Sequence, residues 1–275
     1  MEMIKVKKVL MLIIVLLLSV SIIGCKDKKL NENSEIHVGV SFFPMKDILL
    51  LIQEDLKSEG YDLVIHEFAD YQAPNNLLYN KELDANMIQH DYFLQSFNKA
   101  NNANLVTVQP IYHAIFALYS KEYKSLDEIA NGENITLPDD ATNLSRALYL
   151  LGQAGLLTFN DNKTIGLTVD DIATNSRNLV LGDKVPLTSL AQRYSETGVA
   201  TMYPTYARSL ELVGDEQRLY VEEQDEVTKG YAISLVARDD NKESEKIKAL
   251  IKHITSEKVR QFLIDEYSWA SVPAF

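Results

Sequence analysis

Apolar and polar positions alternate with two different periods along most of this chain. Residues 36–40 (IHVGV) alternate as a strand does, and residues 44–57 repeat apolar side chains at helical spacing. The same reasoning predicts further strands at residues 61–68, 85–88, 105–108, 111–119, 134–137, 198–202 and 230–237, and further helices at residues 74–83, 91–100, 141–157 and 243–267. Strands that alternate with helices are typical of an α/β protein with mainly parallel sheets.

The alternation restarts midway along the chain, after Tyr123. The long apolar run at residues 111–119 could cross between two similar lobes, and residues 230–267 could return to the first. Two crossovers would form a hinge. We therefore expect one lobe from residues 35–116 and 227–275, a second from residues 117–226, and a cleft between them.

The first 24 residues have the composition of a secretory signal. Three lysines precede an apolar run at residues 9–23, which is too short for a permanent membrane span. Cys25 is the only cysteine, and it follows Gly24 directly, as in a bacterial lipobox. We interpret residues 1–24 as a lipoprotein signal peptide, Cys25 as the lipidation site and residues 25–34 as a flexible tether. The alternative is a simple signal peptide followed by an incidental cysteine. The expected location is the extracytoplasmic face of the cell membrane, with the lipid as the only membrane contact.

Charge and composition exclude several classes of function. The chain has 27 basic and 39 acidic residues, a formal net charge of −12, and this becomes −14 without residues 1–24. Such a surface repels nucleic acid and anionic lipid. The sequence contains no G-x-S-x-G, P-loop or G-x-G-x-x-G motif. We therefore expect no enzyme activity and no cofactor.

Three histidines leave one alternative open. His66, His90 and His113 each lie near the end of a predicted strand and could converge on one cleft. With a carboxylate they could hold a metal ion, but hydrogen-bonding histidines of a cleft or core are commoner. No metal ligand is therefore assigned.

Several segments together resemble one known family. They are residues 68–71 (FADY), 74–75, 83–86 (LDAN), 89–90, 118–126, 138–148, 206–207 and 272–275. In order and spacing they are similar to the NlpA-type lipoproteins, the methionine-binding lipoproteins of bacterial ABC importers. The resemblance implies a two-lobed periplasmic-binding-protein-like (type II) fold that closes on a free amino acid. The implied partners are that ligand and the permease and ATPase of the importer, with a monomer as the expected state.

The resemblance also implies a ligand site. A buried zwitterion needs a cationic fork for its carboxylate, and Arg146, near the start of a helix, is the candidate. The alternative is a surface arginine that pairs with Asp139 or Asp140, while Thr142 and Asn143 are expected to cap that helix. The other candidate ligand residues are Phe43, Tyr71, Gln89, His90, Tyr203 and Thr205.

This sequence departs from the family pattern at two polar positions. Tyr203 and Ile233 stand where the family usually has asparagines that bind the amino acid's backbone groups. A different amino acid, a methionine-containing peptide or a derivative therefore remains open as ligand. A non-transport alternative also stays open: an adhesive surface lipoprotein, or a degenerate receptor that no longer binds any small molecule.

Overall fold

The structure is a computed structural model that describes residues 34–41, 43–214 and 217–275. The predicted signal peptide, Cys25 and all but the last residue of the predicted tether lie outside the described residues. None of the helices within the described ranges is long and apolar enough to cross a membrane.

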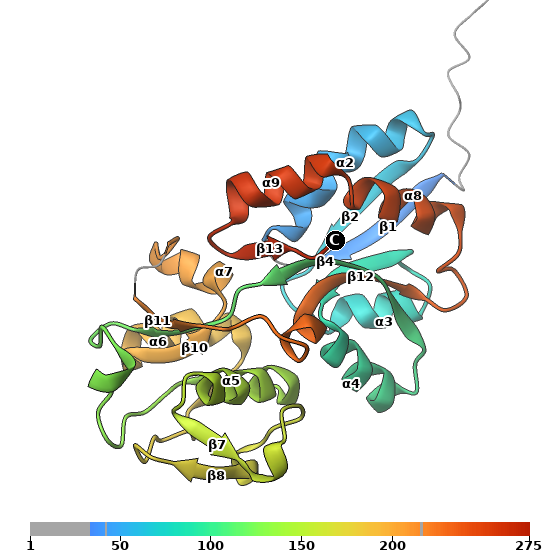
Figure 1. The fold of residues 1–275 in the computed structure, drawn as a ribbon. Coiled ribbons are helices and arrows are strands. Elements are labelled where there is room, and N and C mark those ends of the chain that lie inside the picture. The colour runs from blue at the N-terminus through green and yellow to red at the C-terminus, as the bar shows by residue number, and fades with distance from the viewer. Residues whose placement is uncertain (1–33, 42, 215–216) are drawn as a thin grey trace, which may run out of the picture.

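A six-stranded mixed sheet forms the larger part of the fold (Figure 1). In spatial order its strands are β13 (Ser271–Pro273), β4 (Leu105–Ala114), β12 (Ala232–Arg238), β3 (Ala85–Gln89), β1 (Glu35–Val40) and β2 (Asp62–Glu67). Strand β1 pairs in parallel with β2 and β3, whereas β12 runs antiparallel to both β3 and β4. The prediction of mainly parallel sheets is wrong here, because periodicity reveals a strand but not its direction. The C-terminal strand β12 inserts between β3 and β4 and runs against both.

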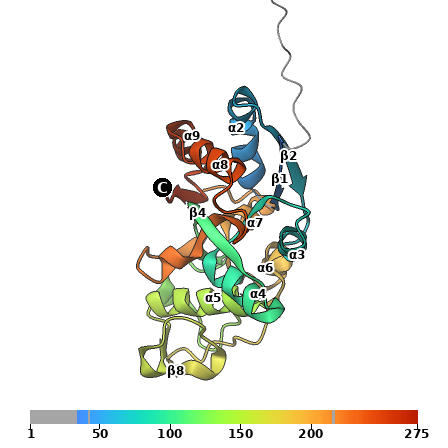
Figure 2. The same ribbon diagram turned by 90° about the vertical axis from the view of Figure 1, so that its right-hand side faces the viewer.

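Helices cover both faces of this sheet, as a sheet with parallel strands requires. They are α2 (Met45–Ser58), α3 (Ala73–Tyr79), α4 (Asp91–Asn101), α8 (Glu245–Ile254) and α9 (Glu257–Tyr267). Helices α2, α8 and α9 lie together, and α3 and α4 lie across the sheet from them (Figures 1 and 2). Two separate apolar clusters match this arrangement. One includes Ile48, Leu49 and Ile52 of α2, and the other includes Leu78 of α3 and Leu94 of α4.

A second group of elements follows β4 and lies at the lower left of Figure 1. Its centre is an antiparallel sheet in the order β10-β5-β11. The group contains β5 (Ala117–Ser120), β6 (Leu137–Pro138), α5 (Ala141–Gln153), β7 (Leu157–Phe159), β8 (Ile172–Asn175), β9 (Lys184–Val185), α6 (Leu190–Thr197), β10 (Val199–Met202), α7 (Pro204–Ala207) and β11 (Arg218–Val221). Short 3-10 turns occur at Leu126–Glu128, Asn160–Asn162, Val169–Asp171, Leu187–Ser189, Arg208–Leu210 and Thr228–Tyr231.

Most predicted elements exist, but several of their ends differ. The strand expected at residues 134–137 is reduced to the two-residue strand β6 and isolated bridges at Asn134 and Thr136. The single strand expected at residues 111–119 is divided between β4 and β5, with residues 115–116 between them. Helix α3 ends at Tyr79 rather than at residue 83, and Lys81 takes a φ of 68°, which no helix continues through. The terminal helices expected within residues 243–267 are α8 and α9, and Ser256 is the N-cap of the second.

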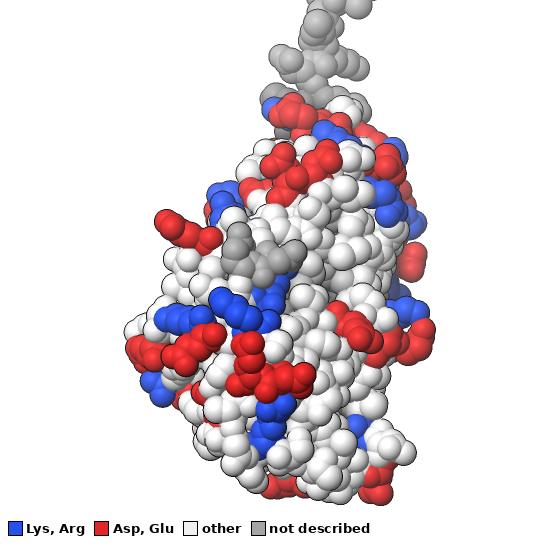
Figure 3. Space-filling model, turned by 60° about the vertical axis from the view of Figure 1, so that its left-hand side comes forward, with Lys and Arg blue, Asp and Glu red and all other residues white. Residues whose placement is uncertain are grey.

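Surface charge is mixed on the face drawn in Figure 3. Acidic and basic side chains are interspersed there, and a broad uncharged area separates several of the groups. This distribution is that of an ordinary solvated surface despite the net negative charge.

Two neighbouring leucines of α2 offer a matched test of the core. Leu49 is 0% exposed and belongs to the larger apolar cluster, whereas Leu50 is 47% exposed. Leu49→Ala should lower the free energy of unfolding by about 2–5 kcal/mol, because it leaves a cavity. Leu50→Ala should change it by about 0.5 kcal/mol or less. Urea denaturation of both variants measures this, and equal losses would contradict the placement of α2.

Candidate functional site

One cavity gathers most of the predicted ligand residues. It has a volume of about 50 Å³, and its walls come from both groups of elements. Six of the seven predicted residues line it: Phe43, Tyr71, Gln89, His90, Tyr203 and Thr205. The seventh, Arg146, does not. Among the described residues that line the cavity none is an aspartate, glutamate, lysine or arginine.

Aromatic side chains form much of the wall. Tyr71 packs edge-on against Phe93 of α4, with 5.3 Å between the ring centroids. Burial raises the pKa of Tyr71, and Asp140 adds to this effect, so its hydroxyl stays protonated at neutral pH. Tyr112 and Tyr206 also line the cavity, although sequence reasoning did not select them. Nothing in their spacing distinguishes them from core tyrosines.

Gln89 is held by a buried amide network at the end of β3. Its side-chain nitrogen donates to Asn75 Oδ1 at 2.5 Å and to Asn86 Oδ1 at 3.2 Å. Its oxygen accepts from Asn75 Nδ2 at 2.7 Å. All three residues are buried. These partners use both N–H donors of the Gln89 amide, so the amide is held in place in the wall of the cavity.

His90 ends the same strand and caps helix α4. Its Nδ1 accepts the backbone N–H of Phe93 at 3.2 Å, which assigns the proton of the neutral ring to Nε2. Burial lowers the pKa of His90 to about 3, repulsion from Arg146 adds to the effect, and the Asn143 side chain opposes it. This opposing effect is a side-chain hydrogen bond with Asn143, which also lines the cavity.

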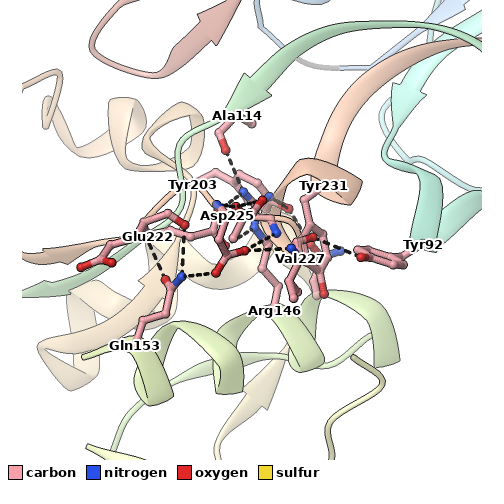
Figure 4. Close-up of polar contacts among 12 residues, drawn as sticks. Tyr92, Ala114, Arg146, Gln153, Tyr203, Glu222, Asp225, Val227 and Tyr231 are labelled. Atoms are coloured by element: carbon pink, nitrogen blue, oxygen red, sulfur yellow. Dashed lines mark hydrogen bonds and ion pairs between the residues drawn. The ribbon is translucent and has the colours of Figure 1, made fainter. Parts of the chain in front are cut away.

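Arg146 lies behind the wall, in a fully buried ion pair (Figure 4). Its Nε donates to Glu222 Oε1 at 2.8 Å and its Nη2 to Glu222 Oε2 at 2.5 Å. Nη2 also donates to the carbonyl of Ala114 at 2.9 Å. Burial alone would lower the pKa of Arg146, but Glu222 and Tyr203 together outweigh burial and raise it. The alternative of a surface arginine paired with Asp139 or Asp140 is wrong.

The start of helix α5 also differs from its prediction. Asp140, rather than Thr142 or Asn143, is the capping residue, and it accepts the backbone N–H of Asn143 at 3.0 Å. The Asn143 side chain lines the cavity, and its Nδ2 donates to the Asp140 carboxylate at 3.0 and 3.1 Å.

Tyr203 connects Arg146 to the cavity. Its hydroxyl accepts from Arg146 Nη1 at 3.1 Å and donates to Asn143 Oδ1 at 2.5 Å. The guanidinium carbon also lies 5.2 Å from the centroid of the Tyr203 ring. Burial raises the pKa of Tyr203, although Arg146 opposes this effect. Tyr203 therefore lies between the cavity and the Arg146–Glu222 pair, which is the only buried ion pair among the described residues.

The three histidines of the metal alternative do not form one site. Nε2 of His66 lies 2.9 Å from Nδ1 of His37, a residue of the neighbouring strand β1. His90 instead lines the cavity. Across the described ranges, no group of three or more histidine, cysteine, aspartate or glutamate side chains is placed to hold a metal ion.

Solved structures of binding proteins share this fold. A putative methionine-binding lipoprotein from Bacillus subtilis superposes with a TM-score of 0.83, at 31% identity over 88% of this chain and 99% of that one. A nutrient binding protein from Burkholderia cenocepacia, solved bound to methionine, gives a TM-score of 0.80 at 27% identity, over 87% of this chain and 100% of that one. The fold is thus a mixed α/β fold of the binding-protein class.

The sequence assigns the family. The model of the NlpA lipoprotein family matches residues 36–275, so the chain belongs to that family of binding lipoproteins, which are not enzymes. A probable D-methionine-binding lipoprotein MetQ from Haemophilus influenzae is 33% identical over 86% of this chain and 88% of its own length. The methionine-binding lipoprotein MetQ of Bacillus subtilis is 32% identical over 87% of this chain and 88% of its own length. The family resemblance seen in the sequence is confirmed.

The low pKa of His90 predicts a pH effect on stability. Between pH 6.5 and about 3 the unfolded chain binds a proton that the folded chain does not, so stability falls as the pH falls. The loss is about 1.4 kcal/mol per pH unit. His90→Asn keeps a capping side chain but cannot take the proton. Its free energy of unfolding in urea should fall by about 2 kcal/mol less than that of the parent chain between pH 7 and pH 5. Equal losses of unfolding free energy in both chains would show that folding does not lower the pKa of His90.

The buried ion pair predicts that removing one of its charges lowers the stability more than removing both. Arg146→Met leaves the carboxylate of Glu222 buried without its partner and should cost about 3–5 kcal/mol of stability. The double variant Arg146→Met with Glu222→Met removes both charges and should be more stable than Arg146→Met alone. Thermal and urea denaturation of four chains measure this: the parent, Arg146→Met, Glu222→Met and the double variant. A double variant that loses as much as the sum of its two single changes would contradict the pairing.

Proposed function

We propose that this chain is the lipid-anchored substrate-binding protein of an ABC importer. It captures methionine, a related amino acid or a short peptide in the cavity and delivers it to the permease and ATPase. The supporting observation is the gathering of six candidate ligand residues around one cavity in a chain of the NlpA family. Lipid on Cys25, with residues 25–34 as a tether, would hold the receptor at the extracytoplasmic face of the membrane.

The proposed capture mechanism is the closure of two lobes, residues 35–116 with 227–275 and residues 117–226. Contacts between the two groups of elements support this division. The Tyr231 hydroxyl of the first lobe donates to the carbonyl of Thr142 in the second at 3.4 Å. Arg208 lies over the ring of Phe43, 4.5 Å from its centroid. Cargo that contacts both lobes favours the form in which these contacts exist, and that form presents a changed surface to a permease.

The aromatic wall supports a thioether or another apolar group in the cargo. Sulfur packs favourably against ring edges, and Tyr71, Phe93 and Tyr206 offer such edges around the cavity. The relative from Burkholderia cenocepacia was solved with methionine bound, so methionine and its derivatives are the first molecules to test.

The proposal is tested by identifying the cargo of the soluble protein. A chain that lacks residues 1–25 is purified and denatured, and the released small molecules are identified by mass spectrometry. Recovery of a thioether-containing amino acid, peptide or derivative is the expected result. An empty protein that no member of an amino-acid and dipeptide panel stabilises would contradict the receptor function and favour a degenerate or adhesive lipoprotein.

Two tyrosines provide a matched pair for the cavity itself. Tyr71 lines the cavity, whereas Tyr79 is an exposed tyrosine at the end of α3. Tyr71→Ala should weaken binding of the recovered cargo by about tenfold or more, because it removes a ring from the wall. Tyr79→Ala should leave binding unchanged. Isothermal titration calorimetry measures both, and equal affinities would place the cargo elsewhere.

A further inference from the structure

Phe43 lies where the cavity opens to solvent. Its side chain lines the cavity, yet 48% of the residue is exposed. It belongs to the segment between β1 and α2, in the first of the two proposed lobes. A molecule that enters or leaves on this side of the cavity therefore passes the ring of Phe43.

Arg208 of the second lobe lies over this ring. Its guanidinium carbon is 4.5 Å from the centroid of the Phe43 ring, which is within the range of a cation–π contact. Arg208 directly follows helix α7 and is exposed. Thr205 and Tyr206 of that helix line the cavity, whereas Arg208 does not. Its side chain is thus held beside the cavity without being part of the wall.

A second contact joins Arg208 to helix α9 of the first lobe. The side chains of Arg208 and Tyr267 form a hydrogen bond. The Tyr267 hydroxyl donates to Asp47 Oδ2 at 2.5 Å, so its oxygen accepts from the guanidinium. Tyr267 is buried, and its ring packs against Phe262 with 5.5 Å between the centroids. Arg208 is therefore bonded to a well-fixed part of the first lobe.

Both contacts of Arg208 exist only while the two lobes are together. A cation–π contact or a hydrogen bond at a partly exposed site contributes about a factor of two to ten to an equilibrium constant. Two such contacts on one side chain can shift the ratio of closed to open protein by about tenfold.

We propose that Arg208, through Phe43 and Tyr267, holds the opening of the cavity closed and so determines how fast cargo leaves. The inference rests on the proposed receptor function and adds a residue that regulates release. Arg208 acts as a positioning residue, because it contacts Phe43 rather than the cargo.

The rate at which L-methionine dissociates tests this role. Trp269, the only tryptophan, lies beside Arg208 and Tyr267 and reports the rate by stopped-flow fluorescence. Arg208→Ala should raise the dissociation rate by about tenfold. The association rate should stay within about twofold, because the two contacts form only after the lobes come together. Arg208→Lys keeps a cation for the Phe43 ring and should give an intermediate rate.

Arg193→Ala is the matched control. Arg193 is also in the second lobe, but its ion pairs are with Asp183 and Glu196 of the same lobe, so both rates should equal those of the parent chain. If Arg208→Ala dissociates at the parent rate, or loses affinity through slower association alone, the inference is overturned and the receptor function stands.

A second measurement needs no cargo. The chain without residues 1–25 has no cysteine, so Tyr79→Cys and Ile165→Cys place one spin label on an exposed site of each lobe. Double electron–electron resonance then measures the closed and open populations. Arg208→Ala should lower their ratio by about tenfold, and an unchanged ratio would overturn the inference. If L-methionine does not bind to the parent chain, this ratio decides alone, and the amino-acid and dipeptide panel judges the receptor function separately.

Discussion

The ion pair between Arg146 and Glu222 is the interaction on which the site depends. Its partners come from helix α5 and from the segment after β11, and Arg146 also donates to Ala114, where β4 ends. One buried guanidinium thus joins three segments that are far apart in the sequence. Such a pair is tolerated inside a protein only when nearly every donor finds an acceptor. The Tyr203 hydroxyl accepts a hydrogen bond from Nη1, the remaining nitrogen of the guanidinium. Displacing a residue from such a buried network costs free energy, because a polar group then loses its partner.

The fold determines where this network meets the cavity. The strand ends of the large sheet supply Gln89 and His90, whereas Tyr203 comes from the start of α7 in the second group of elements. A molecule in the cavity therefore contacts both groups at once, which is the arrangement that lets a ligand bias an opening and closing motion. The wall is rich in aromatic rings and, among its described residues, has no aspartate, glutamate, lysine or arginine, so shape and apolar contact contribute strongly to recognition.

Much of the fold and most of the site could be predicted from the sequence. Period alone located the strand that begins at Glu35, because its alternate residues Ile36, Val38 and Val40 are buried. It also located the strand that begins at Asp62, although only Leu63 is buried there. The direction of β12 could not be predicted, since it depends on which neighbours it finds across about 120 residues of chain. Residue type identified Arg146 as important but not its partner. Glu222 is one of many carboxylates in the sequence, and only the tertiary structure shows that it is buried.

The central claim is that the cavity between the two groups of elements is the place where cargo binds. A crystal structure of the protein with its co-purified cargo tests it most directly. The account predicts a small molecule in the cavity, in contact with Tyr71 and Tyr203. Cargo bound elsewhere, with the cavity empty, would contradict it.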